Sequence, residues 1–209
     1  FVYDSYRRLI MMYADVVMEK ALGLNKSTQS IRELMEKELE SVKKNKGYKN
    51  DSNMKAKDWK ALSNKYLRMV EKEFGIPFPD DHYEQLYGAI AAVFESWNGK
   101  RAKEYRSFEK ISSSMGTAVN VQAMVFGNLG KDCGTGVAFT RNPSTGENIF
   151  FGEWLPNAQG EDVVAGIRTP HPVVGNSRNS LSVAMPEAFK ELDGVRTVSY
   201  THLRAHETG

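Results

Sequence analysis

The chain has 209 residues, with 28 Lys and Arg against 26 Asp and Glu, so its formal net charge is only +2. This balance excludes a general attraction to nucleic acid or an anionic membrane surface, so any anion site must be local. Hydrophobic residues make up 41% of the chain, enough to bury a core in one large or two small domains. No apolar run approaches a membrane span, and the single Cys133 excludes an internal disulfide, so a reducing, cytoplasmic setting fits best.

The first hundred residues follow a helical period. Apolar residues between positions 2 and 17 recur at steps of three and four, which predicts an amphipathic helix with Arg7, Arg8 and Asp15 off its apolar stripe. Capping signals predict three further helices: one behind Ser30-x-x-Glu33, one from Trp59 to Phe74 closed by Gly75, and one opened by Asp81-x-x-Glu84 and ended by Asn98-Gly99.

From about residue 116 the apolar pattern changes to the alternation typical of strands. The stretch "GTAVNVQAMVFGN" at 116–128 predicts a strand with two unlike faces, and "VAFTR" and "NIFFGEWL" predict two more strands of an antiparallel meander. "NAQGEDVVAG" is expected to be a loop that runs into another strand. The fold class is therefore α+β, with a mostly helical part over residues 1–110 and a sheet over 111–190.

Both ends of the chain look unnatural. Phe1 stands where a methionine is expected, already within a predicted helix, so we expect the true N-terminus to be missing. Residues 191–209 diverge into a polar, aperiodic string that resembles endings of unrelated conceptual translations, and we expect this tail to be artefactual.

Two groups of residues in the predicted sheet suggest chemistry. The glycines of "GTG" at 134–136 could bring backbone N–H groups close to a phosphate, although an ordinary hairpin turn would need the same glycines. Neither common nucleotide-binding glycine motif is present. Glu153, Glu161 and Asp162 could face a cleft and bind a ribose or a cation, or could simply be solvated.

Other candidates are weaker. A basic cluster could contact phosphate, but a solvated helical face is the better explanation, and the same holds for Arg7 and Arg8. The histidines lack metal-ligand spacing, so no metal site is predicted, and Cys133 fits an incidental turn residue. The basic cluster comprises Lys100, Arg101, Lys103 and Arg106, and the histidines are His82, His171, His202 and His206.

Five blocks of sequence, taken in order, resemble the N-terminal nucleotide-binding region of the pyruvate, phosphate dikinase family, an ATP-grasp domain. They are "YDSYRRLIMMYADVVME", "AVFESWNGKRAKEYR", "GTAVNVQAMVFGN", "GTGVAFTRNPSTGE" and "NAQGEDVVAGIRTP", and "MPEAF" at 185–189 looks like a further family element. The last two long blocks separate the dikinase from the related phosphoenolpyruvate synthase.

The resemblance implies an ATP-binding region that phosphorylates a histidine on another domain of the same full-length chain. The net reaction interconverts ATP, phosphate and pyruvate with AMP, pyrophosphate and phosphoenolpyruvate, and it uses Mg²⁺. It also implies a homodimer, with no nucleic acid or membrane partner. By the same resemblance the adenine hinge comprises Gln122, Met124 and Val125, the phosphate loop includes Gly136, and the cleft acids are Glu153, Glu161 and Asp162.

The sequence also departs from the family pattern. The family's phosphate-binding lysine and arginine, its closing strand pair with metal-binding acids and a Gln-x-Arg, and its other domains do not occur in the chain. We therefore expect no catalytic residue here and no activity from these residues alone. Two alternatives remain: a phosphoenolpyruvate synthase-like dikinase, and a non-catalytic ATP-grasp binding module.

Overall fold

The computed structural model describes residues 1–25, 27–49, 51–164, 166 and 168–203. The chain divides into two compact units, Phe1–Gln122 and Ala123–Gly209. The first unit is helical, and the second contains a small antiparallel sheet with helices, so the α+β fold class is confirmed.

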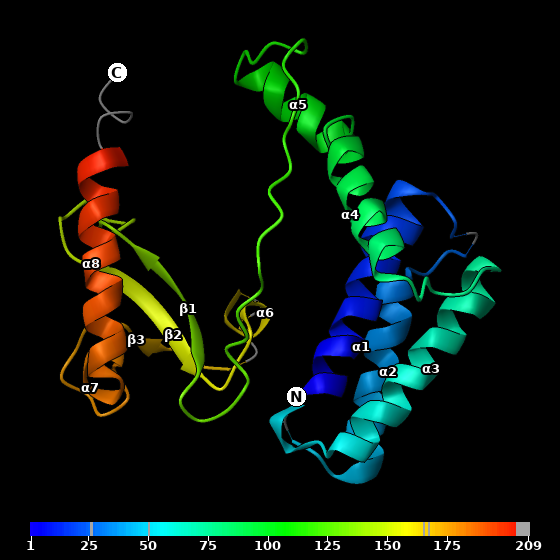
Figure 1. Cartoon of the computed structure of the whole chain (residues 1–209), viewed down its shortest axis with the longest axis horizontal. Helices are drawn as coiled ribbons and strands as arrows, with labels where there is room; N and C mark the ends of the chain where they lie inside the picture. The colour runs from blue at the N-terminus through cyan, green and yellow to red at the C-terminus, as the bar shows by residue number, and fades with distance from the viewer. Residues whose placement is uncertain (26, 50, 165, 167, 204–209) are drawn as a thin grey trace. The chain divides into compact units, whose positions relative to one another are not determined.

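The core of the first unit lies among helices that pack along one another (Figure 1). Tyr66 is fully buried there, and its hydroxyl donates to the Met35 carbonyl oxygen at 2.7 Å, which joins two of the helices. The helical elements are α1 (Val2–Tyr13), the π-helix η1 (Ala14–Ala21), α2 (Ile31–Lys46), the short η2 (Asp51–Asn53), α3 (Ala56–Phe74), α4 (His82–Ser96) and α5 (Lys100–Phe108).

The capping signals give the helix ends correctly. The Ser30 hydroxyl accepts from the Glu33 N–H at 3.2 Å, and the Asp81 carboxylate accepts from the N–H groups of Tyr83 and Glu84. Gly75, the predicted end of α3, adopts a φ of 74°, where a side chain would be strained, and Gly47, which is not among the predicted helix ends, ends α2 with a φ of 71°. Local hydrogen bonds and backbone conformations are therefore present at these predicted helix ends.

The predicted apolar stripe of the first helix is confirmed only in part: Ile10, Tyr13 and Val17 are buried in the core, but Val2, Leu9 and Val16 are exposed, and the charged residues predicted to lie off the stripe are buried. Arg7, Arg8 and Asp15 are 3%, 6% and 3% exposed, so they face the core. They can do so because each charge is paired: Arg7 and Arg8 contact Asp4, at 2.9 and 3.3 Å, and Asp15 contacts Lys20 and Arg32. Neither phosphate contact nor a solvated face describes these two arginines.

The second unit is built on a three-stranded antiparallel sheet in the order β1-β2-β3. Its strands are β1 (Gly134–Phe139), β2 (Phe151–Pro156) and β3 (His171–Pro172), with Gly134 opposite Pro156 and Glu153 opposite Pro172. Figure 1 shows α8 (Pro186–Leu203) lying along one face of the sheet. Trp154, Val173 and Leu181 form the buried cluster on this face, and Leu181 opens the short helix α7 (Leu181–Ala184).

Two strand predictions are wrong. Residues 116–126 are drawn out but form no strand, because no other described segment pairs with them (Figure 1). The segment after "NAQG" forms the helix α6 (Gly160–Val164) instead of a strand, although Ala165 and Ile167 lie outside the described residues. The sheet therefore has three strands, but its third member is β3 and not the 116–126 segment.

The predicted artefactual tail begins inside α8, which is continuous from residue 186 to residue 203. Residues 204–209, including His206, lie outside the described residues. A foreign origin of the tail stays a prediction. Within the described ranges, no helix is long and apolar enough to cross a membrane.

Candidate functional site

Two turns of the second unit are joined beside the sheet. The Ala158 N–H donates to the Gly127 carbonyl oxygen at 3.0 Å, and the Asn157 N–H donates to the Cys133 carbonyl oxygen at 2.8 Å. A Cβ at position 127 would lie 2.5 Å from the Gly134 carbonyl oxygen and closer still to that of Ala158. The backbone of residue 127 thus lies so close to the turn that leads into α6 that only glycine fits at this position.

Side chains strengthen this junction. The buried Gln159 amide donates from Nε2 to the Asn128 side-chain oxygen at 3.2 Å. The Arg168 guanidinium donates to the carbonyl oxygens of Pro156 and Asn157 at 3.2 and 3.3 Å. The predicted site does not include Asn128, Gln159 or Arg168. Their position within the family-like blocks is the one sequence feature that could have pointed to them.

Asp162 and Glu161 sit in the first turn of α6. The Asp162 carboxylate accepts from the Gln159 N–H at 2.9 Å, which is the reciprocal half of a capping box at this helix start. Negative charge near a helix N-terminus is also favoured by the helix dipole. Asp162 therefore stabilises α6, while Glu161 lies one position earlier and is half-buried.

Glu153 lies in β2, where exposed and buried residues alternate. It is exposed, between the buried Gly152 and Trp154, so its carboxylate needs no buried partner. This exposure agrees with the solvated alternative for Glu153. Because α6 packs against both β1 and β2, Glu153 and the α6 acids belong to neighbouring elements of one unit.

Gly136 lies within strand β1, opposite Trp154, and not in a loop. A Cβ at this position would come within 2.6 Å of the Glu153 carbonyl oxygen and 3.0 Å of the Trp154 Cβ. The predicted placement of Gly136 in a phosphate-covering loop is therefore wrong. This glycine is required for close packing between β1 and β2.

The three predicted hinge residues are solvent-exposed. Met124 and Val125 are 64% and 90% exposed, in the extended segment that ends at Gly127. Gln122 is also exposed and falls at the end of the first unit, whereas Met124 and Val125 belong to the second. Met124 and Val125 lie two or three residues before Gly127, whose carbonyl oxygen accepts from the Ala158 N–H of the turn that leads into α6. Gln122 falls in the other unit.

A cavity of about 480 Å³ lies between the sheet and the helices α7 and α8. Of the predicted site residues only Gly136 lines it, and Thr135 is its only polar side chain. The acids of α6 and β2 do not line it. An apolar cavity of this kind does not suit a triphosphate.

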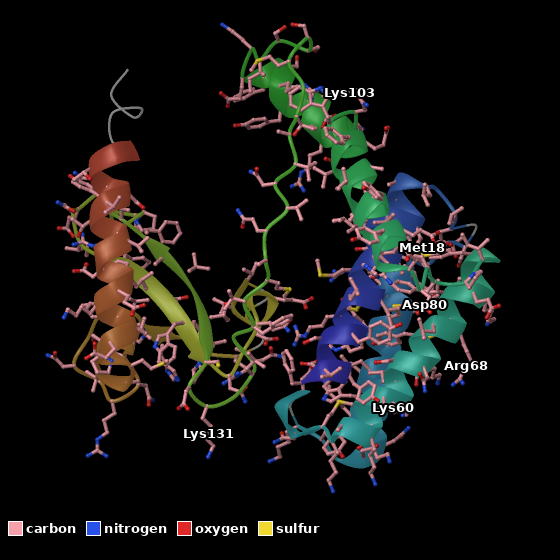
Figure 2. The ribbon with its side chains drawn as sticks, viewed as in Figure 1. Met18, Lys60, Arg68, Asp80, Lys103 and Lys131 are labelled. Carbon is pink, nitrogen blue, oxygen red and sulfur yellow. The ribbon has the colours of Figure 1, made fainter. Side chains whose placement is uncertain are left out.

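The basic cluster on α5 (Lys100–Phe108) divides into one buried and three exposed residues. Arg106 is buried: its guanidinium lies 3.8 Å from the Trp97 ring centroid and donates to the Trp97 carbonyl oxygen at 2.7 Å. Lys100, Arg101 and Lys103 are exposed on α5. Figure 2 shows Lys103 on this helix and Lys131 projecting from the turn before β1. In the part of the chain that the structure describes, no three His, Cys, Asp or Glu residues gather to hold a metal ion.

Comparison with known proteins agrees with the resemblance drawn from the sequence blocks. A family model described as "Pyruvate phosphate dikinase, AMP/ATP-binding domain" matches residues 79–190, more than half of the chain. The chain is 48% identical to pyruvate, phosphate dikinase of Rhizobium meliloti (strain 1021) over 211 residues, covering 98% of this chain and 22% of the relative.

Two more relatives give the same result. Pyruvate, phosphate dikinase 2 of Zea mays is 49% identical over 192 residues, which cover 92% of this chain and 20% of the relative. Pyruvate, phosphate dikinase of Clostridium symbiosum is 45% identical over 205 residues, which cover 98% of this chain and 22% of the relative. The chain thus spans about a fifth of the length of these relatives. It belongs to the pyruvate, phosphate dikinase family, in the region of the AMP/ATP-binding domain.

Proposed function

We propose that this chain is the ATP-binding part of a pyruvate, phosphate dikinase. Its role is to hold ATP while a histidine on another domain of the same full-length polypeptide is phosphorylated. The whole enzyme then interconverts ATP, phosphate and pyruvate with AMP, pyrophosphate and phosphoenolpyruvate. The observation that carries this proposal is the family match over residues 79–190, together with close to half identity to dikinases across nearly the whole chain.

We assign the nucleotide to the region around the Gly127–Ala158 junction in the second unit. Exposed apolar side chains at Met124 and Val125 offer a surface for the adenine ring, and their segment has backbone groups that no strand uses. Glu161 lies beyond the same junction and is assigned to a ribose or metal-linked contact. The further assignments of Gln122, Gly136, Glu153 and Asp162 rest on the family resemblance alone.

The ATP-grasp fold, the phosphohistidine partner, the homodimer and the cytoplasmic setting are parts of the same proposal. The lone, partly exposed Cys133 supports a reducing compartment, although the Flaveria trinervia relative is named chloroplastic. Among the described residues no three acids, histidines or cysteines gather as a ready metal site, so the proposal names no residue as a direct magnesium ligand. Mg²⁺ would arrive with the phosphates of ATP and neutralise their charge.

The test uses a chimeric dikinase, in which residues 1–190 of this chain replace the matched region of the Rhizobium meliloti relative. In this chimera, Glu161→Gln is expected to slow AMP formation from ATP and phosphate by about 10- to 100-fold, because a nucleotide contact is lost. Exchange of labelled pyruvate into phosphoenolpyruvate uses preformed phosphoenzyme and should keep its rate.

The matched control is Glu104→Gln, which removes an exposed carboxylate from α5 of the first unit. Both half-reactions should be unchanged in this variant. Equal losses of both half-reactions in Glu161→Gln would contradict the nucleotide assignment. A chimera that binds MgATP but forms no AMP would instead favour the non-catalytic binding module, and one that forms AMP without phosphate would favour a synthase-like enzyme.

A further inference from the structure

The first helix of the chain has an inverted distribution of side chains. Over α1 and η1, the charged residues Arg7, Arg8 and Asp15 are buried. Four aliphatic residues of the same two elements are exposed, although a soluble helix normally carries polar or charged residues at its exposed positions. They are Val2, Leu9, Met12 and Val16, with exposed fractions of 67%, 42%, 51% and 44%. We call these four residues the aliphatic face.

Other helices of the same unit show that this is not a general property of the fold. In α2 and α3, all of whose residues the structure describes, no large hydrophobic residue is exposed. The outer positions of these helices are polar or charged, with Glu36 and Lys37 on α2 and Arg68 and Lys72 on α3. Arg68 points away from α3 (Figure 2). Large apolar residues are therefore exposed on some helices of the unit and not on others. Besides α1 and η1, they are exposed on α4, at Tyr83, Tyr87, Val93 and Phe94, and on α5, at Tyr105 and Phe108.

The spacing of the aliphatic face suits a second helix. Within α1, Val2 and Leu9 are seven residues apart and Met12 lies three residues after Leu9, as in the seam of two packed α-helices. Val16 follows seven residues after Leu9 in sequence but lies in the π-helix η1. Ser5, at the remaining seam position, is small and lets a neighbouring helix approach closely. None of the four aliphatic side chains carries a charge or a polar tip that would favour exposure.

The exposed area separates two possible occupants. Four side chains of this size present a few hundred Å², whereas a stable complex between separate chains buries roughly 800 Å² on each partner. A segment of the same polypeptide needs less area, because covalent connection supplies a high effective concentration. The relatives are about five times as long as this chain, so they contain ample sequence for such a segment.

We propose that the aliphatic face is covered, in the complete dikinase, by an amphipathic helix from outside these 209 residues. The covering helix presents apolar side chains and no charge to Leu9, Met12 and Val16. The face is thus an internal packing surface of the complete enzyme. This inference does not depend on nucleotide binding by the second unit.

The experiment measures the accessibility of position 12 by thiol alkylation. Met12→Cys is made in a Cys133→Ser background, both in the 209-residue chain and in the chimeric dikinase, and alkylation by a maleimide is followed by mass spectrometry of the peptide that carries residue 12. The control, Arg68→Cys on the charged face of α3, should react rapidly in both proteins. The thiol introduced at position 12 should react rapidly in the 209-residue chain and about tenfold or more slowly in the chimera.

Four other results would overturn the proposal. Rapid reaction in both proteins would mean that the face stays in solvent. Slow reaction in the 209-residue chain would mean that a second copy covers it, if the rate depends on concentration, or that the chain's own second unit covers it, if the rate does not. A chimera that fails to fold is replaced by the Rhizobium meliloti relative with cysteine at the aligned position, where rapid reaction would likewise contradict the proposal.

Discussion

The Arg7 guanidinium donates to the Asp51 carboxylate at 2.8 Å, across 44 positions of sequence. The same guanidinium lies 4.7 Å from the Trp59 ring centroid, so one side chain of α1 contacts both η2 and α3. Asp51 also pairs with Lys43 of α2, at 3.1 Å. Arg7 therefore ties three elements of the helical unit together, and Asp51 extends the connection to a fourth.

Arg7→Ala is expected to lower the free energy of unfolding by about 2–3 kcal/mol, because a buried ion pair and its packing are lost together. Urea unfolding followed by circular dichroism measures this loss. The control is Arg68→Ala, which removes an exposed arginine from α3 and should change the free energy by less than about 0.5 kcal/mol. Equal effects in the two variants would show that burial of Arg7 contributes nothing.

Gly127→Ala tests the junction that precedes α6. A Cβ at this position meets the backbone carbonyl oxygens of Gly134 and Ala158, which cannot rotate away as a side chain can. We expect a loss of about 2–3 kcal/mol in the free energy of unfolding of the second unit, read from amide hydrogen exchange of β1 and β2. Gly130→Ala, in the same turn, has open space around its Cβ and should be tolerated.

The carboxyl of Asp58 makes the stability of the helical unit depend on acid pH. The Tyr48 hydroxyl donates to it at 2.8 Å and is the main cause that lowers the pKa of Asp58 below its usual 3.8, with Lys46 contributing further. Because the pKa of Asp58 is lower in the folded than in the unfolded chain, the carboxylate contributes its full stability above the unfolded pKa. This contribution is lost as the pH falls from the unfolded pKa through the folded pKa. The thermal midpoint should therefore fall as the pH drops through about 4 and below.

Tyr48→Phe removes the largest cause of this shift. The variant should have a lower thermal midpoint than the parent chain at neutral pH, and the difference should shrink as the pH falls below about 4. Tyr87→Phe, which alters an exposed tyrosine of α4, should run parallel to the parent at every pH. A difference for Tyr48→Phe that stays constant across this range would rule out Asp58 as the responsible group.

The 209-residue chain is expected to bind MgATP weakly. The assigned site contributes the carboxylates Glu153, Glu161 and Asp162, which repel phosphates, while the Arg168 guanidinium of the same turn donates to two carbonyl oxygens. Calorimetry should give a dissociation constant above about 100 μM. The chimeric dikinase serves as the positive control, and micromolar binding by the 209-residue chain itself would contradict this expectation.

Local signals in the sequence predict much of the helical unit. Ser30, Asp81 and Gly75 mark helix ends through hydrogen bonds and backbone conformations that involve only neighbouring residues. The β1–β2 hairpin is also predictable, because "NPSTGE" separates two apolar runs. Arg7 is misplaced because one of its ion-pair partners, Asp51, lies 44 positions away in sequence.

The failures in the second unit have a related cause. The alternation of side-chain types in residues 116–126 predicts two unlike faces, but it does not show whether another segment pairs with this one. A strand forms only when its backbone hydrogen-bonds to a neighbouring strand. In the α6 segment, the β-branched side chains of Val163 and Val164 favour a strand, whereas Glu161 and Asp162 favour the start of a helix. The strand prediction follows the valines, but the structure follows the acids. The Gln159–Asn128 contact needs both turns in place, so single-sequence reasoning has no direct access to it.

The capping box at α6 bears on which residues can replace the two adjacent acids. At position 162, serine, threonine or asparagine could still accept from the Gln159 N–H, so a dikinase with one of these residues can keep the turn. At position 161, any good helix former preserves the backbone, whereas a proposed nucleotide contact requires the carboxylate itself. A library that varies both codons would therefore separate the acid that is needed for folding from the acid that is needed for turnover.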